Sequence, residues 1–360
     1  MKITHSTDIV IIGAGVLGLS LAFHLRQRGL RTLVLERELT VGVHASGKNA
    51  GMLRHLYRHP QLTEWANASI SLLPESLRNH AFRQTGSLII GRDIPNHHQQ
   101  LFTTRAHKIR QHNRVVEVPA VVTAADGLFD SQAYMRGLFE LCASDNNFLF
   151  GETVEHVERV ANSIEVVTSS GLRIHTGIVV NAAGAWINRF LFGASVPVQC
   201  FARHLFVVDG FAPDDMPASD VGYVWEEGAE WYVRRWQRQS RLISLCDKIA
   251  ADPDTYPPSV DKTPEVIGTA LLFSKSSHLN IAKAWHCFRT YADDQLPIWG
   301  PDPRMPGLFW LAAFGGFGMS TAFAAAYDAA RLISGELVTI ESEFLPNRLI
   351  DVPAAHNENA

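Results

Sequence analysis

The pattern of hydrophobic and polar positions near the start of the chain predicts a strand, a turn, a helix and a second strand. Residues 9–12 are a continuous apolar run, which is typical of a buried parallel strand. Three glycines follow in a GxGxxG arrangement: Gly13, Gly15 and Gly18. Leucines spaced four apart then give the next segment the apolar stripe of a helix: Leu17, Leu21 and Leu25. Gly29 ends this helix, and residues 32–35 form the second strand, which finishes at Glu36.

The later pattern predicts two further groups of elements. Short or buried strands are expected at 85–91, 154–160, 163–168 and 177–181, and alternating, aromatic-rich strands at 205–208, 231–235 and 242–245. Helices are expected through 62–73 (a polar one), over 130–142 with Asp130 or Ser131 as N-cap, near 263–273, and in an alanine-rich run ending at 333. Parallel and antiparallel textures therefore alternate along the chain, which predicts two interleaved domains.

We place one domain, of α/β class, at residues 1–75, 126–196 and 285–350. The other, with an antiparallel sheet and an α+β composition, takes residues 76–125 and 197–284. Residues 351–360 are expected to be a flexible tail.

Each glycine of the first turn has its own steric role. Gly13 makes the tight turn, Gly15 lets the backbone approach a pyrophosphate, and Gly18 lets the helix pack closely on the strand. The pyrophosphate would lie at the helix N-terminus, where free N–H groups and the dipole favour negative charge. The Glu36 carboxylate would accept hydrogen bonds from ribose hydroxyls and repel a 2′-phosphate, which favours NAD or FAD over NADP.

Composition and charge narrow the classes of function. The 360 residues, 46% of them hydrophobic, can bury a large core, and a net charge of −4 gives no electrostatic case for binding nucleic acid or anionic lipid. The four cysteines are far apart and show no metal-ligand spacing, which predicts free thiols, no metal and a reducing, cytoplasmic compartment. The glycines and Asp8 argue against membrane insertion of the apolar stretch at 9–25. A local basic cluster lines a site or a solvated helix face: Arg54, His55, Arg58 and His59.

Four ordered motifs resemble the FAD-dependent D-amino acid oxidase (DAO) family. They are the segment LERELTVGVHASGKNAG at 35–51 and the stretches 178–186, 285–300 and 307–321. The family includes glycine and sarcosine oxidases and D-amino acid dehydrogenases, and the pattern is most similar to the D-arginine dehydrogenase branch. The resemblance covers nearly the whole chain. It implies FAD as cofactor and a Rossmann-like, GR2-type FAD-binding domain interleaved with the substrate domain.

The resemblance also implies which residues bind the cofactor. Besides the three glycines and Glu36, these are Arg37, His44, Ala45, Ser46, Asn49, Ala50, Gly51, Ala183, Gly184, Trp186, Gly315, Gly316, Phe317, Gly318 and Met319. Three glycines around Phe317, directly before a helix, favour close approach to a planar ligand. The dipole of that helix would stabilise negative charge that develops on the flavin pyrimidine ring.

Four residues match substrate-binding positions of the family. Arg289 would hold the substrate carboxylate through its two-donor fork, although a structural salt bridge with Asp293 or Asp294 is an alternative. Tyr232 would add a second carboxylate contact, and an ordinary half-buried aromatic is the alternative there. Tyr57 matches a tyrosine of the arginine-dehydrogenase branch that would close the pocket from the other side, and an ordinary half-buried aromatic is the alternative there too. Arg203 matches a pocket arginine of the family.

Two positions depart from the patterns of relatives. Relatives that oxidise strongly basic D-amino acids have an acidic residue where this chain has Ser87, so we expect D-arginine not to be the preferred substrate. Cys287 resembles the cysteine that attaches flavin covalently in sarcosine oxidases. Arg289 belongs to the amino acid oxidase pattern instead, and a buried, unmodified thiol is the favoured interpretation of Cys287.

We therefore predict an FAD-dependent enzyme that oxidises the C–N bond of a D-amino acid, or of glycine or sarcosine. The α-hydrogen would leave as hydride to flavin N5, and the resulting imino acid would hydrolyse to a 2-oxo acid and ammonia. Positioning of the substrate against the flavin would do most of the work, so no dedicated acid or base residue would be required. The partners expected are a small-molecule amino acid and an electron acceptor, either oxygen or quinone. An FAD-dependent 2-hydroxy acid dehydrogenase and an accessory flavin subunit of a heteromeric dehydrogenase are the alternatives.

Overall fold

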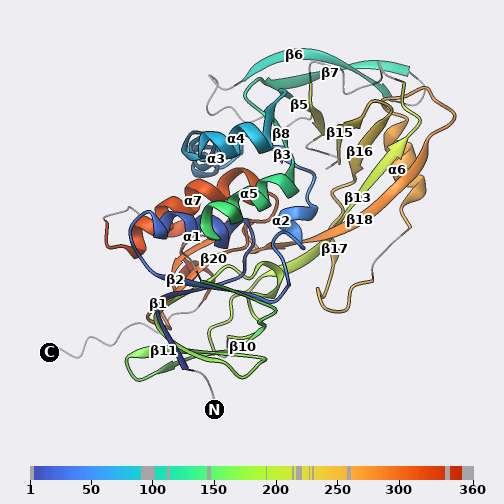
Figure 1. Cartoon of the computed structure of the whole chain (residues 1–360). Helices are drawn as coiled ribbons and strands as arrows, with labels where there is room; N and C mark the ends of the chain where they lie inside the picture. Colours follow the sequence, from blue (N-terminus) through green and yellow to red (C-terminus); the bar gives the residue numbers. More distant parts are fainter. Residues whose placement is uncertain are drawn as a thin grey trace.

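The computed structural model describes residues 4–90, 102–111, 114–143, 147–191, 193–212, 215, 221–226, 228, 231–257, 261–336 and 341–350. The expected flexible tail, 351–360, lies outside the described residues. Figure 1 shows two bodies of secondary structure, one built on β1, β2 and β20 and one built on β13, β16 and β18. Among the described residues, no helix combines the length and the apolar character needed to cross a bilayer.

The first body contains a mainly parallel sheet. Its parallel strands run in the order β9 (Asn147–Phe150), β2 (Thr32–Glu36), β1 (Thr4–Ile12), β12 (Arg173–Asn181) and β20 (Leu308–Ala312). Three antiparallel strands extend it: β10 (Val154–Val160) and β11 (Ser163–Thr168) beyond β12, and β19 (Ile298–Pro301) beside β20. The carboxyl ends of β1, β2 and β12 meet at one edge, which is where ligands bind in such sheets.

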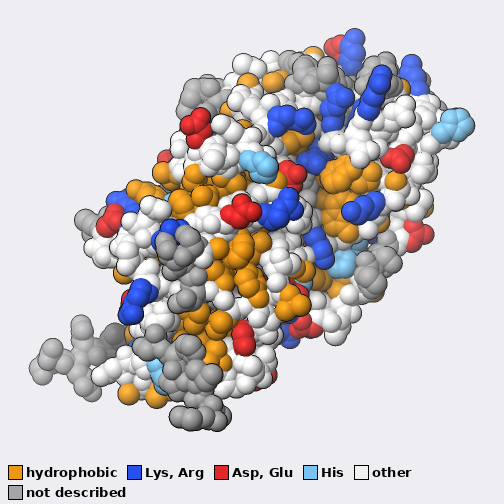
Figure 2. Space-filling view, in the orientation of Figure 1, with side chains coloured by type: hydrophobic (Ala, Val, Ile, Leu, Met, Phe, Trp, Pro, Cys, Tyr) orange, Lys and Arg blue, Asp and Glu red, His pale blue; other side chains and the backbone are white. Residues whose placement is uncertain are grey.

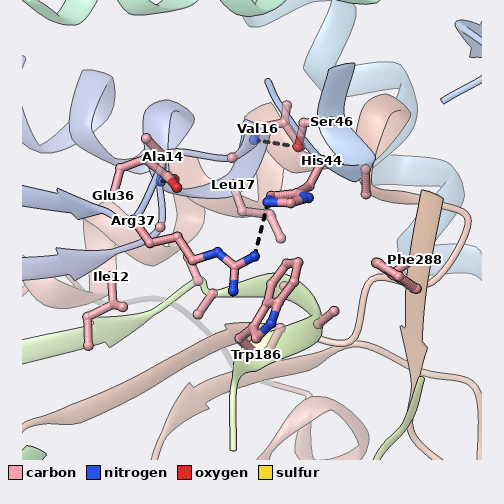
Figure 3. Close-up of a pocket in the computed structure, with 18 of the residues that line it drawn as sticks. Ile12, Ala14, Val16, Leu17, Glu36, Arg37, His44, Ser46, Trp186 and Phe288 are labelled. Atoms are coloured by element: carbon pink, nitrogen blue, oxygen red, sulfur yellow. Dashed lines mark hydrogen bonds between the residues drawn. The ribbon is translucent and has the colours of Figure 1, made fainter. Parts of the chain in front are cut away.

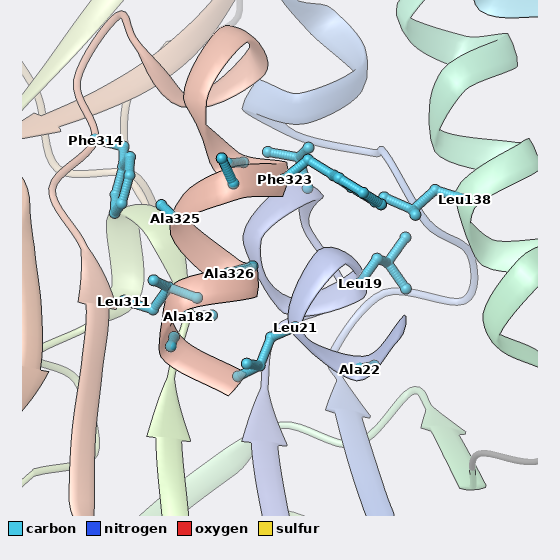
Figure 4. Packing of buried hydrophobic residues seen from close by; sticks show 14 of the residues in the cluster. Leu19, Leu21, Ala22, Leu138, Ala182, Leu311, Phe314, Phe323, Ala325 and Ala326 are labelled. Atoms are coloured by element: carbon cyan, nitrogen blue, oxygen red, sulfur yellow. The ribbon is translucent and has the colours of Figure 1, made fainter. Parts of the chain in front are cut away.

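Helices pack in layers on one side of this sheet. These are α1 (Val16–Arg26), α3 (Pro60–Leu72), α4 (Glu75–Ala81), α5 (Ser131–Ala143) and α7 (Gly318–Ile333), with α3 on α7 and α4 on α5. In Figure 4, Leu19 and Leu21 of α1 lie near Phe323 and Ala326 of α7, and all four are buried. Because α7 is rich in alanine, its backbone can pack closely against α1.

The second body is a nine-stranded sheet. Its order is β17 (Ile249–Ala250), β13 (Gln199–Asp209), β16 (Ser240–Ser244), β15 (Trp231–Gln237), β14 (Tyr223–Glu226), β5 (Ser87–Ile90), β7 (Arg114–Thr123) and β6 (Thr103–Gln111), and β18 (Asn280–Tyr291) also pairs with β13. All pairs are antiparallel except β14 with β5. The helix α6 (Thr263–Ala270) packs on one face through Val266 and Ala270. A small sheet joins β3 (Met52–Leu53), β8 (Gly127–Phe129) and β4 (Phe82–Gln84).

The expected mixed α/β class and most of the expected elements are confirmed. Of the two residues predicted as the N-cap of α5, Asp130 takes this role: its carboxylate accepts a 2.9 Å hydrogen bond from the Ala133 backbone N–H. The helix expected to be polar, α3, has one buried face, which contains Leu62, Trp65 and Ala66. This face is buried because α3 packs on α7. The two-domain division stays a proposal. Its boundary at residue 285 lies inside β18, which pairs continuously with β13 up to Tyr291.

Candidate functional site

Two adjoining cavities contain the predicted site residues. The first, about 220 Å³, lies at the carboxyl ends of β1, β2 and β12. The second, about 630 Å³, lies between the nine-stranded sheet and the segment that follows β3. Arg289 lines both cavities, so this arginine marks where they meet.

The turn after β1 is built as its glycine pattern predicts. Gly13 has a φ of +102°, and a Cβ at this position would lie 2.6 Å from the Ala182 carbonyl oxygen. A Cβ on Gly18 would overlap the Gly13 carbonyl oxygen, so Gly18 permits close packing of α1 and does not line either cavity. The Val16 backbone N–H, at the start of α1, donates a 3.0 Å hydrogen bond to Ser46 Oγ (Figure 3). The remaining N–H groups of the first turn of α1 have no partner within the helix.

Glu36 is held in place by the backbone on both sides. Its Oε2 accepts a 2.7 Å hydrogen bond from the Ala14 N–H, and its Oε1 accepts a 2.9 Å hydrogen bond from the Glu38 N–H. A carboxylate oxygen has two acceptor sites, so both oxygens can accept a further hydrogen bond. Glu36 lines the first cavity, where a diol ligand can reach these sites.

Three side chains from separate segments form a stacked group beside this cavity. The Arg37 guanidinium carbon lies 3.7 Å from the centroid of the Trp186 ring, and the His44 ring centroid lies 4.6 Å from that ring. His44 Nε2 also lies 2.7 Å from Glu38 Oε1. Figure 3 shows Arg37, His44 and Trp186 around the same opening, with Phe288 farther along. The group gives the cavity a wall of flat, polarisable faces.

Two glycine-containing segments line the region between the cavities. Gly315 has a φ of +43°, and a Cβ there would lie 2.3 Å from the Tyr291 ring, while a Cβ on Gly316 would lie 3.1 Å from Arg289 Nη1. On the other side, Asn49 Oδ1 accepts hydrogen bonds from the Gly51 N–H at 2.7 Å and from Ser131 Oγ at 2.8 Å. Every predicted cofactor residue except Gly18 lines one or both of the cavities.

Strand register explains how the two arginines of the second cavity come together. In the β13–β18 ladder, Arg203 opposes Cys287 and Phe201 opposes Arg289, so both arginines lie on one face as diagonal neighbours. Arg203 is 4% exposed, and its Nε and Nη1 have no hydrogen-bond partner among the described residues. A buried cation with unsatisfied donors is costly unless an anion completes it, so this face suits a carboxylate.

The alternative structural role of Arg289 is not what the structure describes. Asp294 makes a two-bond ion pair with Arg348, at 2.6 and 3.1 Å, and Asp293 accepts a hydrogen bond from Gln199. Within the described part of the chain, Arg289 forms no ion pair with either aspartate. Neither aspartate therefore occupies its fork, which lines the cavities and can bind an anion there.

The two predicted tyrosines also line the second cavity. Burial raises the pKa of Tyr232 to about 12, and its hydroxyl has no hydrogen-bond partner among the described residues. Burial likewise raises the pKa of Tyr57, whose ring makes an edge contact with Phe317 at 5.4 Å between centroids. At neutral pH both hydroxyls keep their protons, and Tyr232 can donate a hydrogen bond to a carboxylate.

The two positions that departed from the patterns of relatives are not among the residues that line these cavities. The Ser87 hydroxyl donates a 2.5 Å hydrogen bond to the buried Asp126 carboxylate, and Ser87 lines neither cavity. Cys287 is 3% exposed, packs against Leu205 and Tyr232, and is absent from the described lining of both cavities. Burial raises the pKa of the Cys287 thiol, which favours the interpretation as an unmodified thiol.

Sequence reasoning gave no individual role to several residues that line the second cavity, among them Arg54, Trp225 and Cys246. Arg54, known only as part of a basic cluster, is 8% exposed and lines the cavity with Trp225 and Cys246. Cys246 follows β16 in a left-handed conformation, with a φ of +50°. Trp225 lies opposite Tyr232 in the β14–β15 pair, so it faces the same cavity as that tyrosine. This pairing depends on the fold and has no local pattern in the sequence.

Comparison with known proteins agrees with this geometry. The model of the DAO family, "FAD dependent oxidoreductase", matches residues 8–332. The chain is 23% identical to "FAD-dependent oxidoreductase domain-containing protein 1" of Bos taurus, covering 95% of this chain and 84% of that protein. It is also 23% identical to the D-amino acid dehydrogenase of Xanthobacter autotrophicus, and the match covers 93% of this chain and 97% of that protein. The solved structure of L-proline dehydrogenase from P. horikoshii superposes on this chain with a TM-score of 0.81 at 18% identity. The superposition covers 96% of this chain and 98% of that one.

Proposed function

Since the chain belongs to the FAD-dependent oxidoreductase family, we propose that it oxidises the C–N bond of an amino acid, namely a D-amino acid or a related amine acid such as glycine or sarcosine. The observation that carries this proposal is the position of Arg289. Its guanidinium lies where the two cavities meet, without a carboxylate partner among the described residues and on the same sheet as the unpaired hydroxyl of Tyr232. A carboxylate bound there would sit beside the cofactor cavity.

The residues of the first cavity fit the nucleotide part of FAD. The Glu36 oxygens would bind the ribose hydroxyls, and the first turn of α1 would bind the pyrophosphate through its N–H groups. The N-terminus of α7 faces the junction through Gly318 and Met319, where its dipole would favour negative charge on a bound ring. FAD, when bound, supplies the acceptor for a hydride.

The protein's own contribution is positioning. Arg289 would bind both carboxylate oxygens, Tyr232 would donate a further hydrogen bond, and Tyr57 would cover the substrate from the opposite wall. The α C–H bond then breaks, its electron pair leaves with the hydrogen as hydride, and the nitrogen lone pair forms the C=N bond. Water hydrolyses the imine to a 2-oxo acid and ammonia after release.

Anaerobic reduction of the flavin tests the proposal. The purified protein would be mixed without oxygen with D- and L-amino acids, glycine and sarcosine, and the visible flavin absorption followed. Matched 2-hydroxy acids and amines that lack the carboxylate are the controls. We expect bleaching by amino acids and little by either control. Faster bleaching by a hydroxy acid would instead identify a hydroxy acid dehydrogenase.

Two further results of this experiment are informative. No bleaching by any compound would favour an accessory flavin subunit and overturn the proposal. Once a substrate is found, adding oxygen or a soluble quinone to the reduced protein identifies the electron acceptor. Comparison of the two enantiomers of that substrate decides its stereochemistry.

A further inference from the structure

Arg54 presents an unsatisfied, buried guanidinium to the second cavity. It is 8% exposed, and its carbon Cζ lies 3.6 Å from the centroid of the Trp225 ring and 4.8 Å from that of Tyr57. Its Nη2 donates a 3.2 Å hydrogen bond to the Leu56 carbonyl oxygen, whereas Nε has no partner among the described residues. Stacking therefore fixes the plane of the guanidinium, and its hydrogen-bonding capacity is only partly used within the described part of the chain.

The nearby carboxylates do not neutralise Arg54 directly. Asp126 lies buried behind this wall, but its oxygens accept hydrogen bonds from His55, Ser87 and Tyr223. No ion pair joins Arg54 to a carboxylate in the described part of the chain. Arg54 therefore lines the cavity without a directly bound carboxylate among the described residues.

The cavity as a whole carries more positive than negative charge. Its described lining includes three arginines that make no ion pair with a carboxylate among the described residues, namely Arg54, Arg203 and Arg289, besides Arg58 and Lys248, which have other interactions. The carboxylate among the described lining residues is that of Asp294, which is engaged by Arg348. In Figure 2, Lys and Arg side chains gather over the part of the molecule that contains the nine-stranded sheet. One substrate carboxylate would balance only part of this charge.

Arg54 and Arg289 stand on different walls of the same cavity. Arg54 follows β3, whereas Arg289 lies on β18. A short series of contacts connects them. The Tyr57 ring centroid lies 4.8 Å from Arg54 Cζ and 5.4 Å from the Phe317 ring centroid, and a Cβ on the preceding Gly316 would lie 3.1 Å from Arg289 Nη1. The two guanidiniums are therefore within the span of one small molecule.

We propose that the substrate is an amino dicarboxylate, with its α-carboxylate on Arg289 and its second carboxylate on Arg54. This inference rests on the proposed function. The second carboxylate can belong to the side chain, as in glutamate, or to a substituent on nitrogen, as in iminodiacetate. Each of these two arrangements places the two carboxylates at opposite ends of a short molecule, with the reacting C–N bond between them.

Pairs of substrates that differ only in the second charge test the proposal. The reductive rate divided by the dissociation constant would be measured for D-glutamate against D-glutamine, and for iminodiacetate against its monoamide. We expect at least one diacid to exceed its amide by tenfold or more. The pair that shows the preference tells which of the two arrangements the enzyme accepts. Equal values in both pairs would overturn the proposal.

Variants of Arg54 assign the preference to this residue. In Arg54→Gln, the diacid should lose at least tenfold more than its amide does, and Arg54→Lys should keep part of the preference. Arg31→Gln, at an exposed position that pairs with Asp8, is the matched control and should keep the full preference. A preference that survives intact in Arg54→Gln would overturn the assignment, because a merely structural arginine would affect both substrates alike.

A binding measurement separates this inference from the proposed function. Succinate and its monoamide, which cannot be oxidised at a C–N bond, would be titrated into the flavin-loaded wild-type protein while the flavin spectrum is followed. We expect succinate to bind at least tenfold more tightly. If no amino compound reduces the flavin but succinate shows this preference, the proposed function fails and the diacid site stands. Equal affinities of the wild-type protein for the two compounds would contradict the diacid site. This result does not depend on whether Arg54→Gln retains its flavin.

Discussion

The backbone N–H of Ala14 donates a 2.7 Å hydrogen bond to the carboxylate of Glu36, which joins the turn after β1 to the end of β2. The two residues are 22 positions apart in the chain. The hydrogen bond sets the carboxylate at the edge of the sheet before any ligand arrives, so no side-chain rotation has to be frozen when a ribose binds.

Replacing Glu36 with Gln should weaken FAD binding by about 1 to 3 kcal/mol. The amide keeps the shape but loses the charge, and one of its two ends can no longer accept from the backbone or the ribose. Titration of the flavin-free protein with FAD, followed by flavin fluorescence, measures the loss. Glu117→Gln, an exposed change in β7, is the control. Unchanged affinity in Glu36→Gln would mean that Glu36 does not bind the ribose.

Gly18→Ala should destabilise the protein by about 1 to 3 kcal/mol, although alanine normally favours a helix. The added methyl group would overlap the Gly13 carbonyl oxygen and push α1 away from β1. Gly268→Ala is the matched control, because Gly268 also lies in a helix, with open space around its Cβ position, and should gain about 1 kcal/mol. Urea unfolding of both variants checks the opposite signs. Equal gains would show that α1 is not packed this closely.

Acid should destabilise the fold through His24. Burial lowers the pKa of His24 to about 4, and its Nε2 lies 3.0 Å from the Phe323 carbonyl oxygen. Between this value and the ordinary value of 6.5, the unfolded chain binds a proton that the folded protein does not. The contribution is fully present above pH 6.5 and is lost as the pH falls toward 4, by about 3 kcal/mol at most.

The control for this pH dependence is His24→Gln. Glutamine keeps an N–H donor for the Phe323 carbonyl oxygen but does not titrate, so the free energy of unfolding of this variant should fall less steeply between pH 6.5 and 4. Urea unfolding at several pH values compares the two slopes. Identical slopes would show that His24 is not the responsible group.

The sequence predicted the elements whose patterns are local. The β1–α1–β2 unit follows directly from an apolar run, spaced glycines and a leucine stripe. The structure confirms all three elements, although β1 begins at Thr4, before the apolar run expected at 9–12. The helices α5 and α7 were also expected, from a cap residue and an alanine-rich run. In these segments neighbours in the chain are neighbours in space, so periodicity is sufficient.

The second cavity depended on contacts that local patterns do not contain. The diagonal placement of Arg203 and Arg289 comes from the register between β13 and β18, whose facing ends, Asp209 and Asn280, are about 70 residues apart in the chain. The stacking of Arg54 on Trp225 joins a loop of one body to a strand of the other. The motif resemblance indicated Arg289 itself, whereas Arg54 became distinct from its basic neighbours only through its burial.

The substitution Arg289→Lys tests the central claim, that this arginine holds the substrate carboxylate. Lysine keeps the charge but loses the planar fork, so the α-hydrogen would no longer be held in line for transfer. We predict that kcat/KM for the best amino acid falls by about 3 kcal/mol in transition-state terms, with both kcat and KM affected and FAD content retained. Amines without a carboxylate should be nearly indifferent to the change. A flavin-loaded variant that oxidises the amino acid at the parent rate would contradict the account.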